Sequence, residues 1–299
     1  GIPLGVFQLC LGKGSDVGSY LTSSSIISGV AFTGSSAVAK QIKHNLIKNG
    51  NPGARVIAET GGLNAMVVDS TALCEQVTRD VIDGAFKSAG QRCSALRILM
   101  IQEECFDETL KMIQGAMMEL RIGNPKHLST DCGPVINREA QVKLQSYIEK
   151  SRKRNQIIKD IQCDLKTGYY VTPTIINLKS IDEINEEFFG PILHVISYKS
   201  DELESMIDQL NTKGFGLTFG IHSRIDKQVE EITSRVNAGN IYVNRNQIGA
   251  VVGSQPFGGE GLSGTGPKAG GPSSLHGYSQ SIASTKTTDH ELKLYRNAQ

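Results

Sequence analysis

The chain has 299 residues, with 31 Lys and Arg against 30 Asp and Glu, and a formal net charge of +1. This balance gives no electrostatic argument for binding nucleic acid or an acidic membrane surface, and the length suffices to bury a substantial core without disulfide or metal staples. Because no apolar run reaches the roughly 20 residues that a membrane-spanning helix needs, the composition predicts a cytoplasmic protein with no transmembrane segment and no nucleic-acid partner.

The first 70 residues alternate short apolar runs with a helical pattern. Strands are predicted over residues 6–11, 29–32, 55–58 and 65–68. Apolar residues recur every four positions from Val38 to Leu46, which predicts a helix that opens at the Gly34-Ser35 turn. Short strands that alternate with helices favour an α/β fold with a largely parallel sheet.

The same alternation continues to residue 243. Helices are predicted near residues 73–90, 110–120, 201–210 and 226–236, and strands over 96–101, 192–198, 217–221 and 241–243. The polar stretch over 149–166 is predicted to be a helix followed by a surface loop. Residues 249–277 are dense in Gly, Pro and Ser, which is typical of long ordered loops beside a ligand site.

Cys93 follows a predicted helix in a turn of small residues, Ser88-Ala89-Gly90-Gln91-Arg92-Cys93-Ser94. Such a turn leaves a thiol accessible and offers backbone N–H donors for an oxyanion, which a nucleophilic cysteine needs. Taken alone, a single cysteine is more often a buried structural residue. The six cysteines are dispersed without CxxC spacing, so the sequence predicts no metal site.

Glu59 ends the predicted strand over 55–58 and precedes Thr60-Gly61-Gly62. Ligands of open α/β sheets bind at strand ends, and two glycines let the backbone approach a flat ligand closely. The alternative is a turn carboxylate that caps the next element.

These two segments together resemble the E-[L/T]-G-G and G-Q-x-C motifs of the aldehyde dehydrogenase superfamily. Their separation, 93 − 59 = 34 residues, matches the family arrangement. Residues 32–35, 186–191 and 256–259 are similar to the family's F-T-G-S, E-x-F-G-P and P-F-G-G motifs, in the family's order. The resemblance implies an α/β, aldehyde dehydrogenase-like fold, which comprises part of the Rossmann-like cofactor domain plus the catalytic domain.

The resemblance also implies domain boundaries. Residues 1–60 would be the C-terminal part of the NAD-binding domain, residues 61–262 the catalytic thiol domain, and residues 263–299 a C-terminal segment with an oligomerisation strand. The upstream half of the cofactor domain, which carries the family's oxyanion-hole Asn and a Lys that contacts the adenosine ribose, is not in this sequence. The chain alone is therefore expected to have little activity, and its expected partners are that upstream half, a proline dehydrogenase domain or further copies of itself.

Residues 249–272 and the segment around Cys93 point to one subfamily within this superfamily. They are similar to the L-glutamate γ-semialdehyde (Δ1-pyrroline-5-carboxylate) dehydrogenase module of bifunctional bacterial proline-utilisation proteins. This implies NAD-dependent oxidation of L-glutamate γ-semialdehyde to L-glutamate, the second step of proline degradation. The alternatives are another semialdehyde dehydrogenase and an inactive fragment of a split or truncated enzyme. A cysteine hydrolase without a cofactor would need a His base beside Cys93, and no motif supplies one.

Each site residue has a role that the resemblance implies. Cys93 would be the nucleophile, and Glu59 would be the general base. The cofactor, NAD rather than NADP, would be bound by Gly34, Ser35, Thr60, Gly61, Glu187 and Phe189. The small-molecule aldehyde would be bound by Ser94, Gly249, Ala250 and Phe257.

Overall fold

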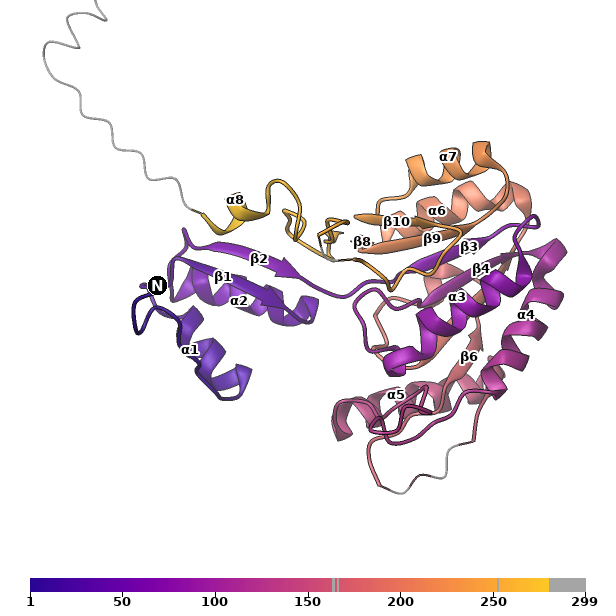
Figure 1. The fold of residues 1–299 in the computed structure, drawn as a ribbon, viewed down its shortest axis with the longest axis horizontal. Coiled ribbons are helices and arrows are strands. Elements are labelled where there is room, and N and C mark those ends of the chain that lie inside the picture. The colour runs from indigo at the N-terminus through magenta and orange to yellow at the C-terminus, as the bar shows by residue number, and fades with distance from the viewer. Residues whose placement is uncertain (163–164, 166, 252, 280–299) are drawn as a thin grey trace, which may run out of the picture.

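The computed structural model describes residues 1–162, 165, 167–251 and 253–279. Figure 1 shows a small lobe with two strands beside a larger lobe that is built on a broad sheet. Within the described part of the chain, every helix is too short or too polar to cross a bilayer.

The small lobe is a two-stranded parallel sheet with one long helix. β1 (Gly29–Thr33) pairs with β2 (Arg55–Glu59), and Thr33 lies opposite Glu59. The helix between them, α2 (Ser36–Lys48), begins at Ser35, whose hydroxyl accepts a hydrogen bond from the Val38 N–H at 3.3 Å. This is an N-cap, which satisfies a donor that the first turn of a helix leaves free.

Two short helices complete the small lobe. α1 (Ser19–Thr22) follows a π-helical turn at Gly14–Gly18 and is joined to α2 where the Asn45 amide donates to the Thr22 hydroxyl at 3.1 Å. α8 (Ser274–Tyr278) lies beside β2, where the Arg55 guanidinium donates to the His276 carbonyl at 2.6 Å. The C-terminal part of the described chain therefore returns to the lobe in which the chain begins.

The strand predicted over residues 6–11 is wrong. The segment forms no regular element, and Phe7 and Leu11 are 90% and 82% exposed. A strand is stable when a neighbour pairs with its backbone N–H and C=O groups, and no described strand lies beside this one. An apolar run predicts a strand only where the fold supplies a partner.

The larger lobe contains a seven-stranded sheet in the order β10-β9-β3-β4-β7-β6-β5. Its strands are β3 (Ala65–Val68), β4 (Ile98–Gln102), β5 (Ile157–Asp160), β6 (Thr174–Asn177), β7 (Ile192–Tyr198), β9 (Thr218–His222) and β10 (Asn240–Val243). All neighbours are parallel except β5, which runs antiparallel to β6. The central strands are buried along their whole length, which explains their unbroken apolar sequences.

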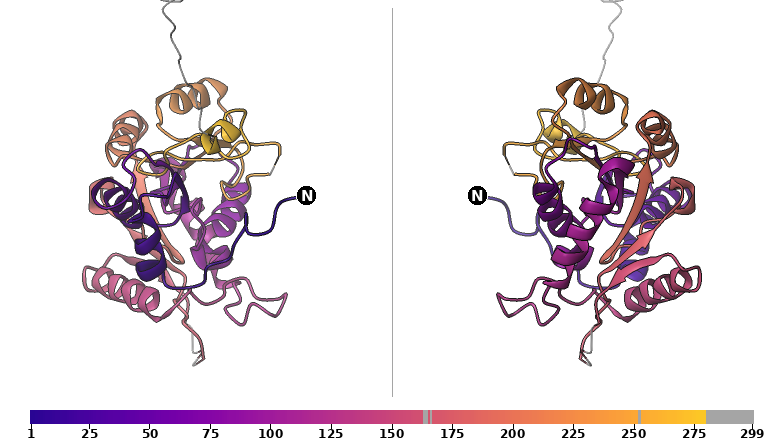
Figure 2. Two further views of the ribbon diagram at one scale, coloured as in Figure 1. Left: turned by 90° about the vertical axis from the view of Figure 1, so that its left-hand side faces the viewer. Right: turned by 90° about the vertical axis from the view of Figure 1, so that its right-hand side faces the viewer.

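Helices cover both faces of this sheet (Figures 1 and 2). α3 (Cys74–Phe86) and α4 (Glu103–Met118) pack on one face, against Met66 and Leu99. α5 (Arg138–Lys153), α6 (Leu203–Thr212) and α7 (Asp226–Arg235) pack on the other, against Val67 and Ile98. Because successive strand residues point to opposite faces, neighbouring positions such as Met66 and Val67 belong to different apolar clusters.

The remaining elements are short. The helix predicted near 73–90 is α3, which ends at Phe86, and the residues up to Gly90 form a separate turn. Single turns of 3₁₀ helix lie at Ile181–Glu183 and Ser200–Glu202, Lys87–Gly90 forms a turn with positive φ angles, and β8 (Phe215–Gly216) pairs antiparallel with β11 (Glu260–Gly261). Strands β5 and β6 were missed, and β5 occupies part of the stretch for which a surface loop was predicted. The oligomerisation strand expected within 263–299 is not among the described residues up to 279, and residues 280–299 lie outside them.

Candidate active site

The turn that carries Cys93 has a strained backbone. After α3 ends at Phe86, Ser88, Ala89 and Gly90 all have positive φ angles, of 56°, 52° and 62°. Non-glycine residues rarely adopt this region, and such strain concentrates at functional sites. At Gly90 even an added Cβ would lie 2.2 Å from the Gly190 carbonyl oxygen, so a side chain is excluded there.

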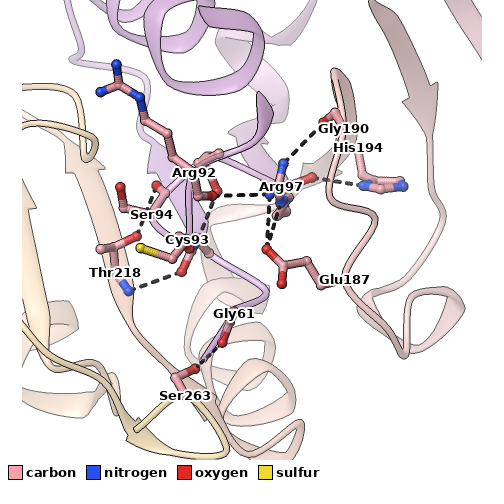
Figure 3. Close-up of polar contacts among 12 residues, drawn as sticks. Gly61, Arg92, Cys93, Ser94, Arg97, Glu187, Gly190, His194, Thr218 and Ser263 are labelled. Atoms are coloured by element: carbon pink, nitrogen blue, oxygen red, sulfur yellow. Dashed lines mark hydrogen bonds and ion pairs between the residues drawn. The ribbon is translucent and has the colours of Figure 1, made fainter. Parts of the chain in front are cut away.

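Two polar residues fix the main chain on either side of the thiol. The Asn64 amide donates to the carbonyls of Cys93 and Ala95 at 2.7 and 2.9 Å, and its oxygen accepts from the Thr218 N–H at 3.1 Å. The Thr218 hydroxyl lies 3.4 Å from the Ser94 carbonyl, to which it donates (Figure 3). The starts of β3 and β9 therefore hold the nucleophile turn in place.

Opposing influences act on the Cys93 thiol. Burial raises its pKa above the ordinary value, whereas hydrogen bonds from the backbone N–H groups of Ser94 and of Cys93 itself lower it. The negative charges of Glu187 and Glu59 raise it further. The geometry joins these groups step by step: the Arg97 guanidinium donates both to Glu187 and to the Arg92 carbonyl next to Cys93. Glu187 in turn lies over Gly61, two residues after Glu59.

Glu59 presents a carboxylate with one oxygen engaged and one unengaged. Its Oε2 accepts from the Gly259 N–H at 2.9 Å, and its Oε1 is buried with no hydrogen-bond partner among the described residues. A Cβ added at Gly258 or Gly264 would lie about 3 Å from Oε1, so glycines make room for the carboxylate. Burial raises the Glu59 pKa, although the Gly259 hydrogen bond lowers it.

Glu187 lies directly over Gly61. Its Oε1 accepts from the Arg97 guanidinium at 3.0 and 3.3 Å (Figure 3), and its Oε2 lies 1.7 Å from where a Cβ on Gly61 would be. Burial raises the Glu187 pKa, and Arg97 opposes that rise. A side chain at position 61 would displace the Glu187 carboxylate from the place where Arg97 holds it.

The segment that follows Glu59 is tied to the loop over 256–264. The Thr60 hydroxyl donates to the Leu262 carbonyl at 2.5 Å, and the Thr60 N–H donates to the Ser263 carbonyl at 2.8 Å. The Ser263 hydroxyl donates to the Gly61 carbonyl at 2.8 Å (Figure 3). The P-F-G-G loop and the E-T-G-G segment, 200 residues apart, therefore form one wall of the site.

Gly34 and Ser35 stand at the exposed N-terminus of α2, beside this wall. The Gly34 N–H donates to the Glu59 carbonyl at 3.1 Å, which places the start of α2 next to the end of β2. A helix N-terminus presents free N–H groups and the positive end of the helix dipole, and so it favours an anion such as a phosphate.

Arg92 links the nucleophile turn to the loop that carries Gly249 and Ala250, two of the residues expected to bind the substrate. Its guanidinium donates to the Ile248 carbonyl at 3.4 Å, next to Gly249 and Ala250. Phe257 is half-buried and exchanges main-chain hydrogen bonds of 3.0 and 2.8 Å with Ala269. Phe189, expected beside the cofactor, is 42% exposed, and its ring lies 5.3 Å from the Arg97 guanidinium carbon.

Sequence reasoning assigned no role to Asn64, Arg97, Thr218 or Ser263, although all four are buried and hold the site together. A signal was available for two of them. Asn64 stands at the start of a buried strand, and Arg97 lies within the apolar run predicted over 96–101. Because a buried polar or charged group needs a partner, both positions pointed to a structured polar cluster.

The chain is similar to proteins of one known family. Residues 1–283 match the family described as "Aldehyde dehydrogenase family". The chain is 51% identical to the bifunctional protein PutA of Klebsiella aerogenes, over 92% of the chain and 22% of that protein. A structure of proline utilization A from Bradyrhizobium japonicum matches 93% of the chain and 28% of its own, with 48% identity and a TM-score of 0.89.

A structure of 1-pyrroline-5-carboxylate dehydrogenase from Thermus with bound NAD has 32% identity and a TM-score of 0.80, over 89% of the chain and 52% of its own. The chain thus spans about a fifth of the length of the PutA relative and about half of the Thermus protein.

Proposed function

Because the chain belongs to the aldehyde dehydrogenase family, we propose that it carries the catalytic centre for oxidising L-glutamate γ-semialdehyde to L-glutamate with NAD. The observation that carries this proposal is the link between the strained Cys93 turn and Glu187 through the Arg97 guanidinium. Glu187 lies over Gly61, two residues after Glu59, whose Oε1 has no partner among the described residues. A nucleophile beside a base that can activate water is the pair that this oxidation requires.

The residues fit a dinucleotide cofactor. The exposed N-terminus of α2 at Gly34 and Ser35 suits the pyrophosphate, and the small Thr60-Gly61-Gly62 segment suits the approach of a flat ring beside the Glu187 carboxylate that lies over Gly61. Glu187 would hold the ribose next to that ring, with Phe189 beside it and Thr60 anchoring the wall. NAD, when bound, supplies the hydride acceptor. The family accounts for NAD or NADP, and the Thermus structure with bound NAD favours NAD.

The chain's own groups account for the remaining chemistry. The Cys93 thiolate attacks the aldehyde carbon and forms a thiohemiacetal, whose oxyanion the nearby backbone N–H groups stabilise. After the hydride leaves, Cys93 carries a thioester. The unengaged oxygen of Glu59 takes a proton from water, the hydroxide adds to the thioester carbon, and the C–S bond breaks to release the acid and the thiolate.

Glutamate semialdehyde brings an α-carboxylate that must also be bound. We assign it to the Ser94 hydroxyl and to the N–H groups of Gly249 and Ala250, with Phe257 packing on the carbon chain. The Arg92–Ile248 hydrogen bond supports this assignment because it joins the loop to the nucleophile turn. The names of the relatives, PutA and 1-pyrroline-5-carboxylate dehydrogenase, support the same substrate.

The test is NADH formation by the chain with glutamate semialdehyde and, separately, with succinate semialdehyde, using Cys93→Ala as the control. We expect NADH formation that requires Cys93 and favours glutamate semialdehyde. An equal rate in Cys93→Ala, or a preference for succinate semialdehyde, would show the proposal to be wrong.

A further inference from the structure

Arg97 is the most deeply buried charged residue beside the nucleophile, with 0% of its surface exposed. Three acceptors surround its guanidinium: the Glu187 carboxylate at 3.0 Å, the Gly190 carbonyl at 3.2 Å and the Arg92 carbonyl at 3.3 Å. The Arg92 carbonyl belongs to the residue that precedes Cys93. One planar side chain therefore touches both the nucleophile turn and the carboxylate over Gly61 (Figure 3).

The main chain of Arg97 is held from the opposite side by His194 of β7. His194 Nδ1 lies 2.9 Å from the Arg97 carbonyl, and Nε2 lies 2.9 Å from the Tyr147 hydroxyl. Burial lowers the His194 pKa to about 4, so the ring is neutral. A carbonyl can only accept, so Nδ1 carries the proton and Nε2 accepts from Tyr147.

Tyr147 links His194 to the segment that carries Glu187. Its ring stacks on Phe188 with centroids 3.6 Å apart and an interplanar angle of 12°. Phe188 is the residue after Glu187, so the Glu187 main chain is fixed by the same side chain that binds His194. Arg97 and Glu187 are thus held at both the backbone and the side chain, in register with each other.

We propose that Arg97 is a positioning residue, which fixes the Cys93 turn and the Glu187 carboxylate relative to each other through one buried guanidinium. It touches no substrate or cofactor and acts through these two neighbours. Its charge also offsets that of Glu187, which would otherwise stand unpaired beside the thiol. The inference rests on the proposed catalytic role of Cys93 and adds the residue that holds the Cys93 turn and the Glu187 carboxylate in place.

The charged and titratable groups that interact electrostatically with Cys93 come from four places. Glu59 lies at the end of β2, Glu187 precedes β7, Tyr242 lies in β10, and Arg97 follows the turn itself. Loss of Arg97 leaves the Glu187 charge without its partner, and an unpaired negative charge disfavours the thiolate. Loss of both charges removes that effect.

The experiment is alkylation of Cys93 by iodoacetamide as a function of pH in the full chain, with the modified cysteine identified by peptide mass spectrometry. The variants are Arg97→Met, Glu187→Gln and the double variant. We expect Arg97→Met to slow alkylation near neutral pH by about tenfold, which is an upward shift of about one pKa unit in the thiol. Glu187→Gln should speed it, and the double variant should stay within about twofold of Glu187→Gln.

Non-additivity of this kind separates positioning through Glu187 from a general loosening of the fold. An Arg97→Met effect that persists undiminished in the double variant, or an unchanged pH profile in Glu187→Gln, would overturn the proposal. The matched control is Glu186→Gln, at the position next to Glu187. Glu186 is exposed and paired with Lys143, so removing its charge should leave the pH profile of alkylation unchanged.

Thermal unfolding gives a second measurement. Arg97→Met buries a carboxylate without its partner, so it should unfold at a lower temperature than the double variant. The reverse order would contradict the proposal. Neither measurement needs turnover, so a failure of the proposed dehydrogenase activity would leave both results interpretable.

Discussion

The Gly259 N–H donates to Glu59 Oε2 at 2.9 Å, and this hydrogen bond fixes one edge of the carboxylate while Oε1 is buried beside Gly258 and Gly264. The unengaged Oε1 is buried and lacks a partner among the described residues. A buried acceptor without a partner is costly, and water is the natural species to bind it during a hydrolytic step. In the proposed mechanism, Oε2 therefore holds the side chain in place and Oε1 is the oxygen that takes the proton from water.

Glu59→Gln tests this division of roles. The amide keeps the shape of the side chain but cannot take a proton from water, so we expect thioester hydrolysis to slow by about 10²–10⁴-fold. The thiol attack and hydride transfer do not need this base and should survive. Rapid mixing should therefore show a burst of NADH followed by little steady-state turnover. Loss of the burst together with the steady-state rate would contradict the assignment of Glu59 to hydrolysis.

The pH dependence follows from the directions of two pKa shifts. Burial raises the Glu59 pKa above its ordinary 4.5, and burial with the two carboxylates raises the Cys93 pKa above 9.0. Both groups work in their deprotonated forms, so activity is lost as pH falls through either pKa. We expect the rate to rise with pH, with an acidic limb above pH 4.5 set by Glu59 and a further rise above pH 9.0 set by Cys93, and the acidic limb to disappear in Glu59→Gln. A rate that falls over this range in the unmodified chain would refute the assignment.

Ser94→Ala tests the carboxylate anchor. If the hydroxyl binds the α-carboxylate of glutamate semialdehyde, its loss removes one charge-assisted hydrogen bond worth about 1.5–3 kcal/mol. The kcat/KM for glutamate semialdehyde should fall by that amount, while an uncharged aldehyde of similar length should lose much less. Equal losses for both aldehydes would show that Ser94 does not contact the carboxylate.

Sequence alone predicted much of the seven-stranded sheet but few of the buried polar residues that hold the site residues in place. β3 and β7 coincide with the runs predicted over 65–68 and 192–198 because buried parallel strands are continuous apolar segments. The short strand β6 and the polar edge strand β5 lack that signature. The roles of Asn64 and Arg97 depend on contacts with residues 154 and 90 positions away, which no local pattern encodes.

The motif residues could be predicted because glycines and a cysteine at fixed spacing are a pattern of the sequence itself. The structural reason for each glycine could not be predicted. Gly61 is covered by Glu187, and Gly90 by the Gly190 carbonyl, and both relationships arise only when the segments fold together.

Gly90→Ala tests how tightly the nucleophile turn is packed. The residue has a φ of 62°, and its Cβ would meet the Gly190 carbonyl oxygen at 2.2 Å. Left-handed strain alone costs about 1–2 kcal/mol, and the clash adds to it. We expect a lower unfolding temperature and slower Cys93 alkylation or turnover. The control is Gly115→Ala, in α4 with open space around it, which should raise stability by about 0.5–1 kcal/mol. Equal effects of the two substitutions would contradict this account.

The small lobe is predicted to be the least stable part of the described chain. β1 and β2 form a sheet of only two strands, and two strands alone are marginal in water. By contrast, β4 is buried along its whole length between two neighbours in a seven-stranded sheet. We therefore expect amide hydrogens of β1 and β2 to exchange roughly a hundredfold or more faster than those of β4, because local opening needs less free energy there.

The same instability should weaken cofactor binding, since Gly34 and Ser35 belong to this lobe and must be ordered when NAD binds. NAD should slow exchange in β1, β2 and the first turn of α2 while leaving β4 unchanged, and the affinity of the chain alone should be low. Hydrogen exchange followed by mass spectrometry, with and without NAD, measures both effects. Equal protection of β1 and β4 in the free chain, or tight NAD binding without any change in the small lobe, would be inconsistent with this prediction.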